Sequence, residues 1–288
     1  MNLSPEIEAI LHKFQVQPDA LLGHGGEAFV FALDDGRILR IAHAGTSQQD
    51  LIDRAALLSE LAPGAAQLPF AIPAVLEIHQ IDNRVLTIEP RLPGRPLPDV
   101  LLETGGSARA NLIRAYLDAA ARLGDLSLHR PWYGEIRRDN AIRTAVFADY
   151  LVQRAAAGLQ AGGAAFRRID PQQLAAALPT PDQPEFVHLD AFAGNMLAAD
   201  GKITAVLDFG AVCLMGDRRL DPLTAAIYLT PAITPSATDD DRAVAQAWLV
   251  EHDLDVWFEP AQRWIAAFWA FAHNDKALFE WCQSVLLA

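Results

Sequence analysis

Residues 188–210 read HLDAFAGNMLAADGKITAVLDFG, and this stretch decides the expected fold. A histidine is followed two residues later by Asp190, and Asn195 comes five residues after that aspartate. Asp208 begins an Asp-Phe-Gly motif thirteen residues further on, directly after an apolar run. A hairpin that turns at Asp200-Gly201 would bring Asp208 back beside Asn195. The pattern therefore predicts that two carboxylates and one amide converge.

The chemistry of this set points to phosphoryl transfer. In that reaction one carboxylate orients or accepts the proton of the attacking hydroxyl, while an amide oxygen and a second carboxylate hold magnesium. Asp190 fits the first task, and Asn195 and Asp208 fit the second. A metal-dependent hydrolase with His188, Asp190 and Asp208 as ligands is an alternative, but it leaves Asn195 without a role.

A glycine-rich segment near the start supports this interpretation. Gly23, Gly25 and Gly26 lie in the sequence GHGGE, which leads into the apolar run 29–33, an Asp35-Gly36 turn and a second run at 37–41. Glycines let backbone N–H groups approach phosphates. A Walker A or dinucleotide-binding loop would lead into a helix, whereas here a strand follows. A loop between two antiparallel strands above the phosphates is the kinase arrangement.

The periodicity of apolar residues divides the chain into two parts. We expect helices near residues 5–14 and 50–62 and strands near 75–81 and 85–88 in the first part. Prolines interrupt the segment 89–98, which marks the boundary. Helices dominate beyond it, at 112–126, 147–159 and 240–288. The prediction is an α+β, bilobal fold with a small antiparallel-sheet lobe at 1–92 and a larger, mainly helical lobe at 93–288.

Composition excludes several classes of protein. A chain of 288 residues that is 51% hydrophobic can bury a sizeable core. Its net charge of −13 argues against a nucleic-acid partner and allows a cationic substrate. It has no apolar stretch of about 18 to 20 residues, and its start lacks the features of a secretion signal, so we expect no membrane partner. Two cysteines, Cys213 and Cys282, are expected to be reduced and buried, as in a cytoplasmic protein.

From these motifs, the chain resembles the aminoglycoside phosphotransferase family, which has a protein-kinase-like fold. The resemblance covers about residues 20–230 and is most specific at 188–221, where Gly216-Asp217 and Asp221 match a further family element. It implies that Asp190 is the catalytic base, that His188 orients the catalytic loop, and that Asn195 and Asp208 bind Mg²⁺. It also implies that Asp221 accepts backbone N–H bonds from the loop.

Two positions depart from the family pattern. Leu189 stands where the family usually has glycine, and Arg40 stands where a lysine of the third strand is usual. Arginine keeps the positive charge and can bind phosphate oxygens through two donors. We therefore expect Arg40 to contact the phosphates of the nucleotide. Its usual glutamate partner on the following helix has no clear equivalent, because Asp53 and Arg54 occupy the best-aligned positions.

A purine base is expected between the two lobes, where apolar side chains enclose a flat ring and backbone groups supply hydrogen bonds. The expected apolar contacts are Leu22, Val30 and Ile41 above the ring and Leu197 below it. The expected backbone partners are the Glu89 carbonyl and the Arg91 amide, because Pro90 has no N–H. The nucleotide is expected to be ATP, and GTP is left open, because the backbone contacts that select between the two bases cannot be read from side chains.

The short distance from Asp208 to Asp221 favours a small-molecule acceptor. Twelve residues lie between them, which is too few for an activation segment that docks a peptide. We therefore expect transfer of the γ-phosphate to a hydroxylated small molecule. Several acidic residues could face an amine of that molecule or simply cap helices, namely Asp239, Asp240, Asp241 and Asp275. A nucleotide-binding pseudokinase with a regulatory role is the alternative function, and the sequence indicates no oligomeric state.

Overall fold

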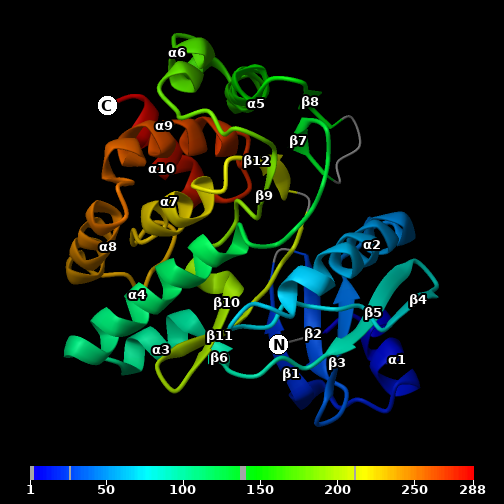
Figure 1. Ribbon diagram of the computed structural model, residues 1–288. Coiled ribbons are helices and arrows are strands. Elements are labelled where there is room, and N and C mark those ends of the chain that lie inside the picture. The colour runs from blue at the N-terminus through cyan, green and yellow to red at the C-terminus, as the bar shows by residue number, and fades with distance from the viewer. Residues whose placement is uncertain (1–2, 26, 137–140, 211) are drawn as a thin grey trace.

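The computed structural model describes residues 3–25, 27–136, 141–210 and 212–288. Figure 1 shows a smaller body, which contains a twisted sheet with α1 and α2, beside a larger body made mainly of helices. The predicted α+β, bilobal class is confirmed. The boundary predicted after residue 92 stays a prediction, although strands of the first sheet end at Pro90 and the next strand, β6, pairs elsewhere.

The smaller body is built on an antiparallel sheet with the strand order β1-β2-β3-β5-β4. Its strands are β1 (Leu21–His24), β2 (Ala28–Ala32), β3 (Arg37–Ala42), β4 (Glu77–Ile81) and β5 (Arg84–Pro90). The helix α1 (Pro5–Lys13) begins after Ser4, whose side chain accepts a hydrogen bond from the Ile7 amide. The helix α2 (Gln48–Ala65) begins with a capping box formed by Ser47 and Asp50. Both predicted helices are present.

The two faces of this sheet serve different purposes. One face carries Phe31, Leu39 and Ile41, which pack with α1 in a single buried cluster. The other face carries Val30 and Arg40, which are direct neighbours across β2 and β3. Adjacent residues of a strand point to opposite faces. The expectation that Ile41 contacts a purine is therefore wrong, because its side chain is fully buried on the α1 side.

The larger body contains two small sheets. The strand β10 (Met196–Ala199) pairs with β11 (Lys202–Val206) and with the short β6 (Arg95–Pro96). The other sheet has the order β8-β7-β12-β9. Its strands are β7 (Tyr133–Glu135), β8 (Arg143–Thr144), β9 (Glu185–Val187) and β12 (Leu214–Gly216). Gly94 has a φ of +110°, and a Cβ there would lie 2.3 Å from the Thr204 hydroxyl, so only glycine lets the chain cross into β6 this closely.

Eight α-helices of the described chain surround these sheets. They are α3 (Leu97–Glu103), α4 (Gly106–Leu123), α5 (Phe147–Gly162), α6 (Pro171–Ala176), α7 (Leu220–Ile227), α8 (Asp239–Glu251), α9 (Phe258–Trp269) and α10 (Lys276–Leu286). Their shared core includes the fully buried Trp248 and Trp264, and it also encloses Cys213 and Cys282. None of the helices in the described ranges combines the length and apolar character that a bilayer crossing requires.

Candidate active site

The predicted catalytic loop, residues 188–195, begins where β9 ends and is held by a buried carboxylate from α7. The backbone N–H groups of His188 and Leu189 donate to the two oxygens of Asp221 at 3.0 and 2.8 Å. Asp221 is completely buried, and burial raises its pKa to about 7 against the effect of these two bonds. The geometry matches the supporting role that the family resemblance implied for Asp221.

Leu189 holds a conformation that glycine adopts more easily. Its φ is +64°, in the left-handed region, and its side chain is fully buried. The family pattern with glycine at this position suits such a backbone. Here the Asp221 bond and the buried side chain hold a leucine in the same conformation, at a cost of roughly 1 to 2 kcal/mol. The loop therefore keeps this left-handed conformation although residue 189 is a leucine.

His188 connects the catalytic loop to the segment before Asp208. Its Nε2 lies 3.0 Å from the Leu207 carbonyl, and its Nδ1 accepts a hydrogen bond of 3.3 Å from the Asp190 amide. Burial lowers the pKa of the imidazole to about 4, so the ring is neutral at pH 7. The edge of the ring also packs on Phe209. Both nitrogens are occupied within the protein, which fits an orienting role and argues against metal ligation by His188.

Asp190 and Asn195 are joined directly. The Asn195 Nδ2 donates to the backbone carbonyl of Asp190 at 3.0 Å and to its Oδ2 at 3.1 Å. The Asn195 backbone carbonyl accepts from the Leu207 amide, which ties this residue to the strand before Asp208. Burial and the negative charge of Asp208 raise the pKa of Asp190 well above its usual range. A carboxyl in this environment is suited to take up a proton.

Asp208 completes the group that the sequence predicted. Its φ is +57°, and its buried Oδ1 has no hydrogen-bond partner among the described residues. Burial and the charge of Glu27 raise its pKa, and Arg40 lowers it in part. An orphaned buried carboxylate oxygen needs a partner. Together with the side-chain oxygen of Asn195, it provides the hard oxygen ligands that Mg²⁺ prefers, so these residues fit the predicted metal.

Within the described ranges, no group of three or more His, Cys, Asp or Glu side chains has the arrangement of a metal ligand set. The hydrolase alternative required His188, Asp190 and Asp208 to form such a set. His188 uses both ring nitrogens inside the loop. The residues present therefore do not fit the ligand set of that alternative.

The structure provides partners for Arg40 that the sequence did not reveal. The Arg40 guanidinium donates to the Glu27 carboxylate of the glycine-rich segment at 2.8 Å. The arginine of α2, Arg54, instead binds Glu89 of β5 through two bonds of 2.6 and 3.2 Å. The hydroxyl of Thr87 donates a third bond to Glu89. The helix thus contributes the cation and the sheet contributes the anion, the reverse of the arrangement that the resemblance implied.

These pairs decide the charge states around Arg40. Burial alone would lower the pKa of Arg40, but the carboxylates of Glu27, Glu89 and Asp208 raise it above its usual value. Burial alone would raise the pKa of Glu89, but Arg54 and the Thr87 hydroxyl keep it low. Both groups are therefore charged at pH 7. A charged guanidinium lies close to Asp208, where the phosphates of a nucleotide are expected.

Gly23 and the remaining expected purine contacts, Leu22, Val30 and Leu197, lie on the strands β1, β2 and β10. Gly23 pairs with Val30 across β1 and β2, and a side chain added to Gly23 or Gly25 would meet nothing within 4 Å. Gly26 lies outside the described residues. Val30 is half-buried beside Arg40, and Leu197 is half-buried in β10 opposite Pro96. Leu22 is 45% exposed.

The expected hinge contacts need correction. The Arg91 amide donates to the Gly36 carbonyl at 2.8 Å, so it is not free to bind a purine. In an antiparallel pair of strands, residues whose backbone groups bond to the neighbouring strand alternate with residues whose groups point away from it. Glu89 lies opposite Ile38, two residues before Arg91, so its carbonyl also faces β3. By the same alternation the Pro90 carbonyl points away from β3. The sequence does not reveal this, because the register of β5 on β3 is not visible in it.

Three of the four acidic residues considered for an amine are engaged elsewhere, and the fourth, Asp240, is exposed in the first turn of α8. Asp241 is buried, binds Arg109 at 2.6 Å and completes a capping box with Thr238. Asp239 pairs with Arg242, and Asp275 caps the first turn of α10. These residues have the structural roles that were the alternative interpretation. Two tyrosines also lie near Asp190, since burial and the charge of Asp190 raise the pKa of both Tyr116 and Tyr228, and the Tyr228 hydroxyl accepts from the Trp269 indole at 2.6 Å.

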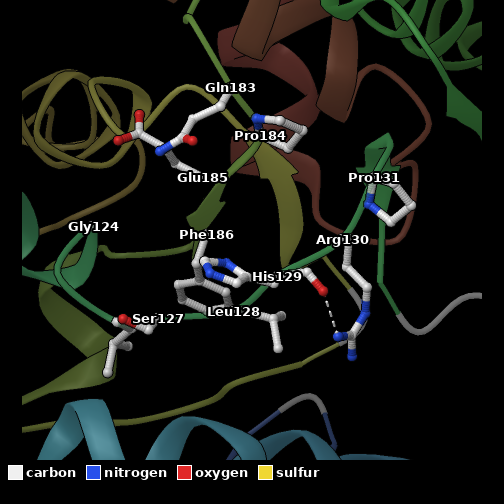
Figure 2. A pocket seen from close by; sticks show the side chains of 11 residues that line it. Gly124, Ser127, Leu128, His129, Arg130, Pro131, Gln183, Pro184, Glu185 and Phe186 are labelled. Atoms are coloured by element: carbon white, nitrogen blue, oxygen red, sulfur yellow. Dashed lines mark hydrogen bonds between the residues drawn. The ribbon is translucent and has the colours of Figure 1, made fainter.

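A cavity of about 510 Å³ lies apart from all the predicted site residues. Figure 2 shows that residues of the segment after α4 and residues around β9 surround it. One of them, Phe186, stacks on Phe209 with ring centroids 6.1 Å apart. The lining residues are Gly124, Leu126, Ser127, Leu128, His129, Arg130, Pro131, Gln183, Pro184, Glu185 and Phe186. This cavity therefore adjoins the residues behind the catalytic loop.

Comparison with known proteins is informative at the level of family and fold. A model described as the phosphotransferase enzyme family matches residues 20–249. Among curated protein sequences, none matches this chain.

Similar solved structures include the gentamicin complex of APH(2")-IIa, which is 16% identical, with a TM-score of 0.65 over 100% of this chain and 97% of that one. The ADP-bound aminoglycoside phosphotransferase APH(2'')-Ib is 15% identical, with a TM-score of 0.61 over 99% of this chain and 97% of that one. The GDP complex of aminoglycoside 2'-phosphotransferase-IIIa is 12% identical, with a TM-score of 0.61 over 99% and 98%. At these identities the similarity establishes the fold.

Proposed function

Because the chain belongs to the phosphotransferase enzyme family, we propose that it transfers the γ-phosphate of ATP to a hydroxyl group of a small molecule. The observation that carries this proposal is the convergence of Asp190, Asn195 and the unpartnered oxygen of Asp208. These three residues supply a proton acceptor and two oxygen ligands in one place. Arg40 adds a positive charge on the side of the first sheet.

The proposed reaction depends on positioning and on charge neutralisation. Asn195 and Asp208 would hold Mg²⁺, which when bound neutralises charge on the phosphate oxygens. Asp190 orients the acceptor hydroxyl and takes its proton, and its raised pKa brings proton uptake closer to neutral pH. His188 and Asp221 act by holding the backbone of this loop in place.

The nucleotide is proposed to lie between the two bodies. Val30 would cover one face of the purine and Leu197 the other, while the Pro90 carbonyl and the Leu92 amide offer the backbone contacts. The backbone of the glycine-rich segment and the Arg40 guanidinium would bind the phosphates. GTP is the second nucleotide to test, since these backbone contacts can suit either base.

The acceptor is proposed to be a hydroxylated small molecule. Gentamicin and streptomycin are named in structures of a similar protein, so aminoglycosides are the first compounds to test. Of the four carboxylates that were candidates for an amine, Asp239, Asp241 and Asp275 are used in caps and ion pairs. The panel should therefore also contain uncharged hydroxylated metabolites and macrolides.

The test is an assay of ADP release against this panel with and without Mg²⁺. We expect release that depends on both an acceptor and the metal, with kcat lowered about 10² to 10⁴-fold by Asp190→Ala. The variant Asp200→Asn, at the exposed β10–β11 turn, serves as a control with unchanged activity. Tight ATP binding without turnover of any acceptor would instead support the pseudokinase alternative.

A further inference from the structure

Arg40 lies between two carboxylates that are built very differently. Glu89 is 3% exposed and is bound by both guanidinium nitrogens of Arg54 and by the Thr87 hydroxyl. The Glu27 side chain is 53% exposed and meets Arg40 through one oxygen at 2.8 Å. A buried carboxylate with three donors is fixed, because leaving them would strand buried charges. An exposed carboxylate with a single charged partner can leave at little cost.

The backbone of Glu27 is anchored while its side chain reaches out. The His43 amide donates to the Glu27 carbonyl at 2.9 Å, and the His43 ring lies 2.8 Å from the Gly25 carbonyl. The His43 ring also packs edge-on against Phe29 at 5.1 Å. Rotation of the Glu27 side chain therefore requires no movement of the strands on either side of the segment.

The carboxylate of Glu27 extends towards the catalytic residues of the other body. Its Oε1 lies 3.6 Å from the position that a Cβ on Gly210 would take, two residues after Asp208. Its charge acts on both Asp208 and Asp190. The carboxylates of Glu27 and Asp208 thus share the space next to the Arg40 guanidinium. A triphosphate that entered this space would be repelled by Glu27 and attracted by the cation that Glu27 now occupies.

We propose that Glu27 occupies on Arg40 the place that a nucleotide phosphate takes, and that binding of the nucleotide displaces it while Glu89 stays with Arg54. This inference rests on the proposed function. A guanidinium binds carboxylate and phosphate with the same donors, so the two anions compete for Arg40. Glu27 thereby sets how strongly the site selects ligands that carry a phosphate over the bare nucleoside.

The test is isothermal titration of the full chain with MgATP and, separately, with adenosine. Glu27→Gln removes the competing charge, and we expect it to lower the Kd for MgATP about two- to five-fold, the range of an exposed ion pair. The Kd for adenosine should stay the same, because adenosine has no phosphate to reach Arg40. A higher salt concentration should reduce the difference in the Kd for MgATP between the variant and the wild type.

A matched control is available in the Arg114–Glu251 pair. This pair joins an exposed arginine of α4 to an exposed glutamate of α8 at 2.6 Å in the larger body. Glu251→Gln should leave the Kd for both ligands unchanged. In an Arg40→Ala background, the effect of Glu27→Gln on MgATP should be smaller, because the competition for Arg40 is gone and only the direct repulsion between Glu27 and the phosphates remains. Glu27→Ala gives a second variant without the charge if Glu27→Gln does not fold.

Two other outcomes have separate meanings. If the wild type binds MgATP and both Glu27 variants bind it equally or more weakly, Glu27 supports the nucleotide and the inference is wrong. If the wild type binds no nucleotide with Mg²⁺, the proposed function itself fails and the inference fails with it. If the Glu27 variants bound adenosine more tightly by the same factor as MgATP, the inference would also be wrong, because the substitution would then have changed the site as a whole.

Discussion

The catalytic loop and the Arg54–Glu89 pair of the smaller body stabilise a buried carboxylate in different ways. In the loop, the buried Asp221 is satisfied by backbone N–H groups of two consecutive residues. In the smaller body, the Glu89 carboxylate of the sheet is bound by Arg54 of α2, across 35 residues of sequence. The loop contact survives almost any change of neighbouring side chains, because the backbone supplies the donors. The sheet contact requires two particular side chains together.

The largest effect on folding is expected from breaking the sheet pair. Arg54→Met leaves the Glu89 carboxylate buried beside Thr87 without its main partner, and we expect it to lower the free energy of unfolding by about 3 to 5 kcal/mol. The double variant Arg54→Met with Glu89→Met removes both charges and should recover most of this loss. Urea unfolding followed by circular dichroism measures both. Equal losses in the single and double variants would show that the pair is not the source of the effect.

The same contrast explains what the sequence could predict. The residues of the catalytic loop have fixed local spacing, so their convergence at Asp190 and Asn195 followed from the order of residues and one hairpin. The Arg54–Glu89 pair joins a helix to a distant strand, and its formation depends on where α2 packs on the sheet. Charges at two distant positions do not reveal that contact. The hinge contacts failed for a similar reason, since a shift of one residue in the strand register exchanges the two edges of β5.

The wrong expectation for Ile41 had a visible signal, and a local pattern also decides between the two roles left open for Asp241. Arg40 and Ile41 are adjacent in one strand, so a phosphate-binding role for Arg40 already placed Ile41 on the opposite face. Thr238 precedes Asp241 by three residues, which is the spacing of a capping box. That spacing, confirmed by the bonds at the start of α8, assigned Asp241 to a helix terminus and not to a ligand. Strand alternation and the spacing of the cap residues therefore predict the positions of Ile41 and Asp241 better than charge and hydrophobicity do.

A smaller effect is expected when the loop is tested through pH. The pKa of His188 is about 4 in the folded protein and 6.5 for an ordinary histidine, so the unfolded chain binds a proton more readily. This group therefore stabilises the fold above about pH 6.5, and the contribution of up to about 3 kcal/mol is lost as pH falls towards 4. Replacement by glutamine should flatten the dependence of unfolding free energy on pH over this range. Guanidinium titrations of both proteins from pH 4 to 7 provide the comparison, and parallel curves would rule out this assignment.

The smallest effect concerns Leu189, where the loop backbone itself carries strain. Both Leu189→Ala and Leu189→Gly remove the same buried side chain, except for one methyl group, and both should destabilise the protein. Glycine usually costs about 0.5 to 1 kcal/mol more than alanine, because it gives the unfolded chain more freedom. At a φ of +64° alanine keeps the strain and glycine relieves it, so we expect Leu189→Gly to be the more stable by about 1 kcal/mol. Thermal unfolding of the two variants under identical conditions measures this difference. The usual order, with alanine more stable, would mean that the bonds to Asp221 do not hold residue 189 in the left-handed region once its side chain is removed.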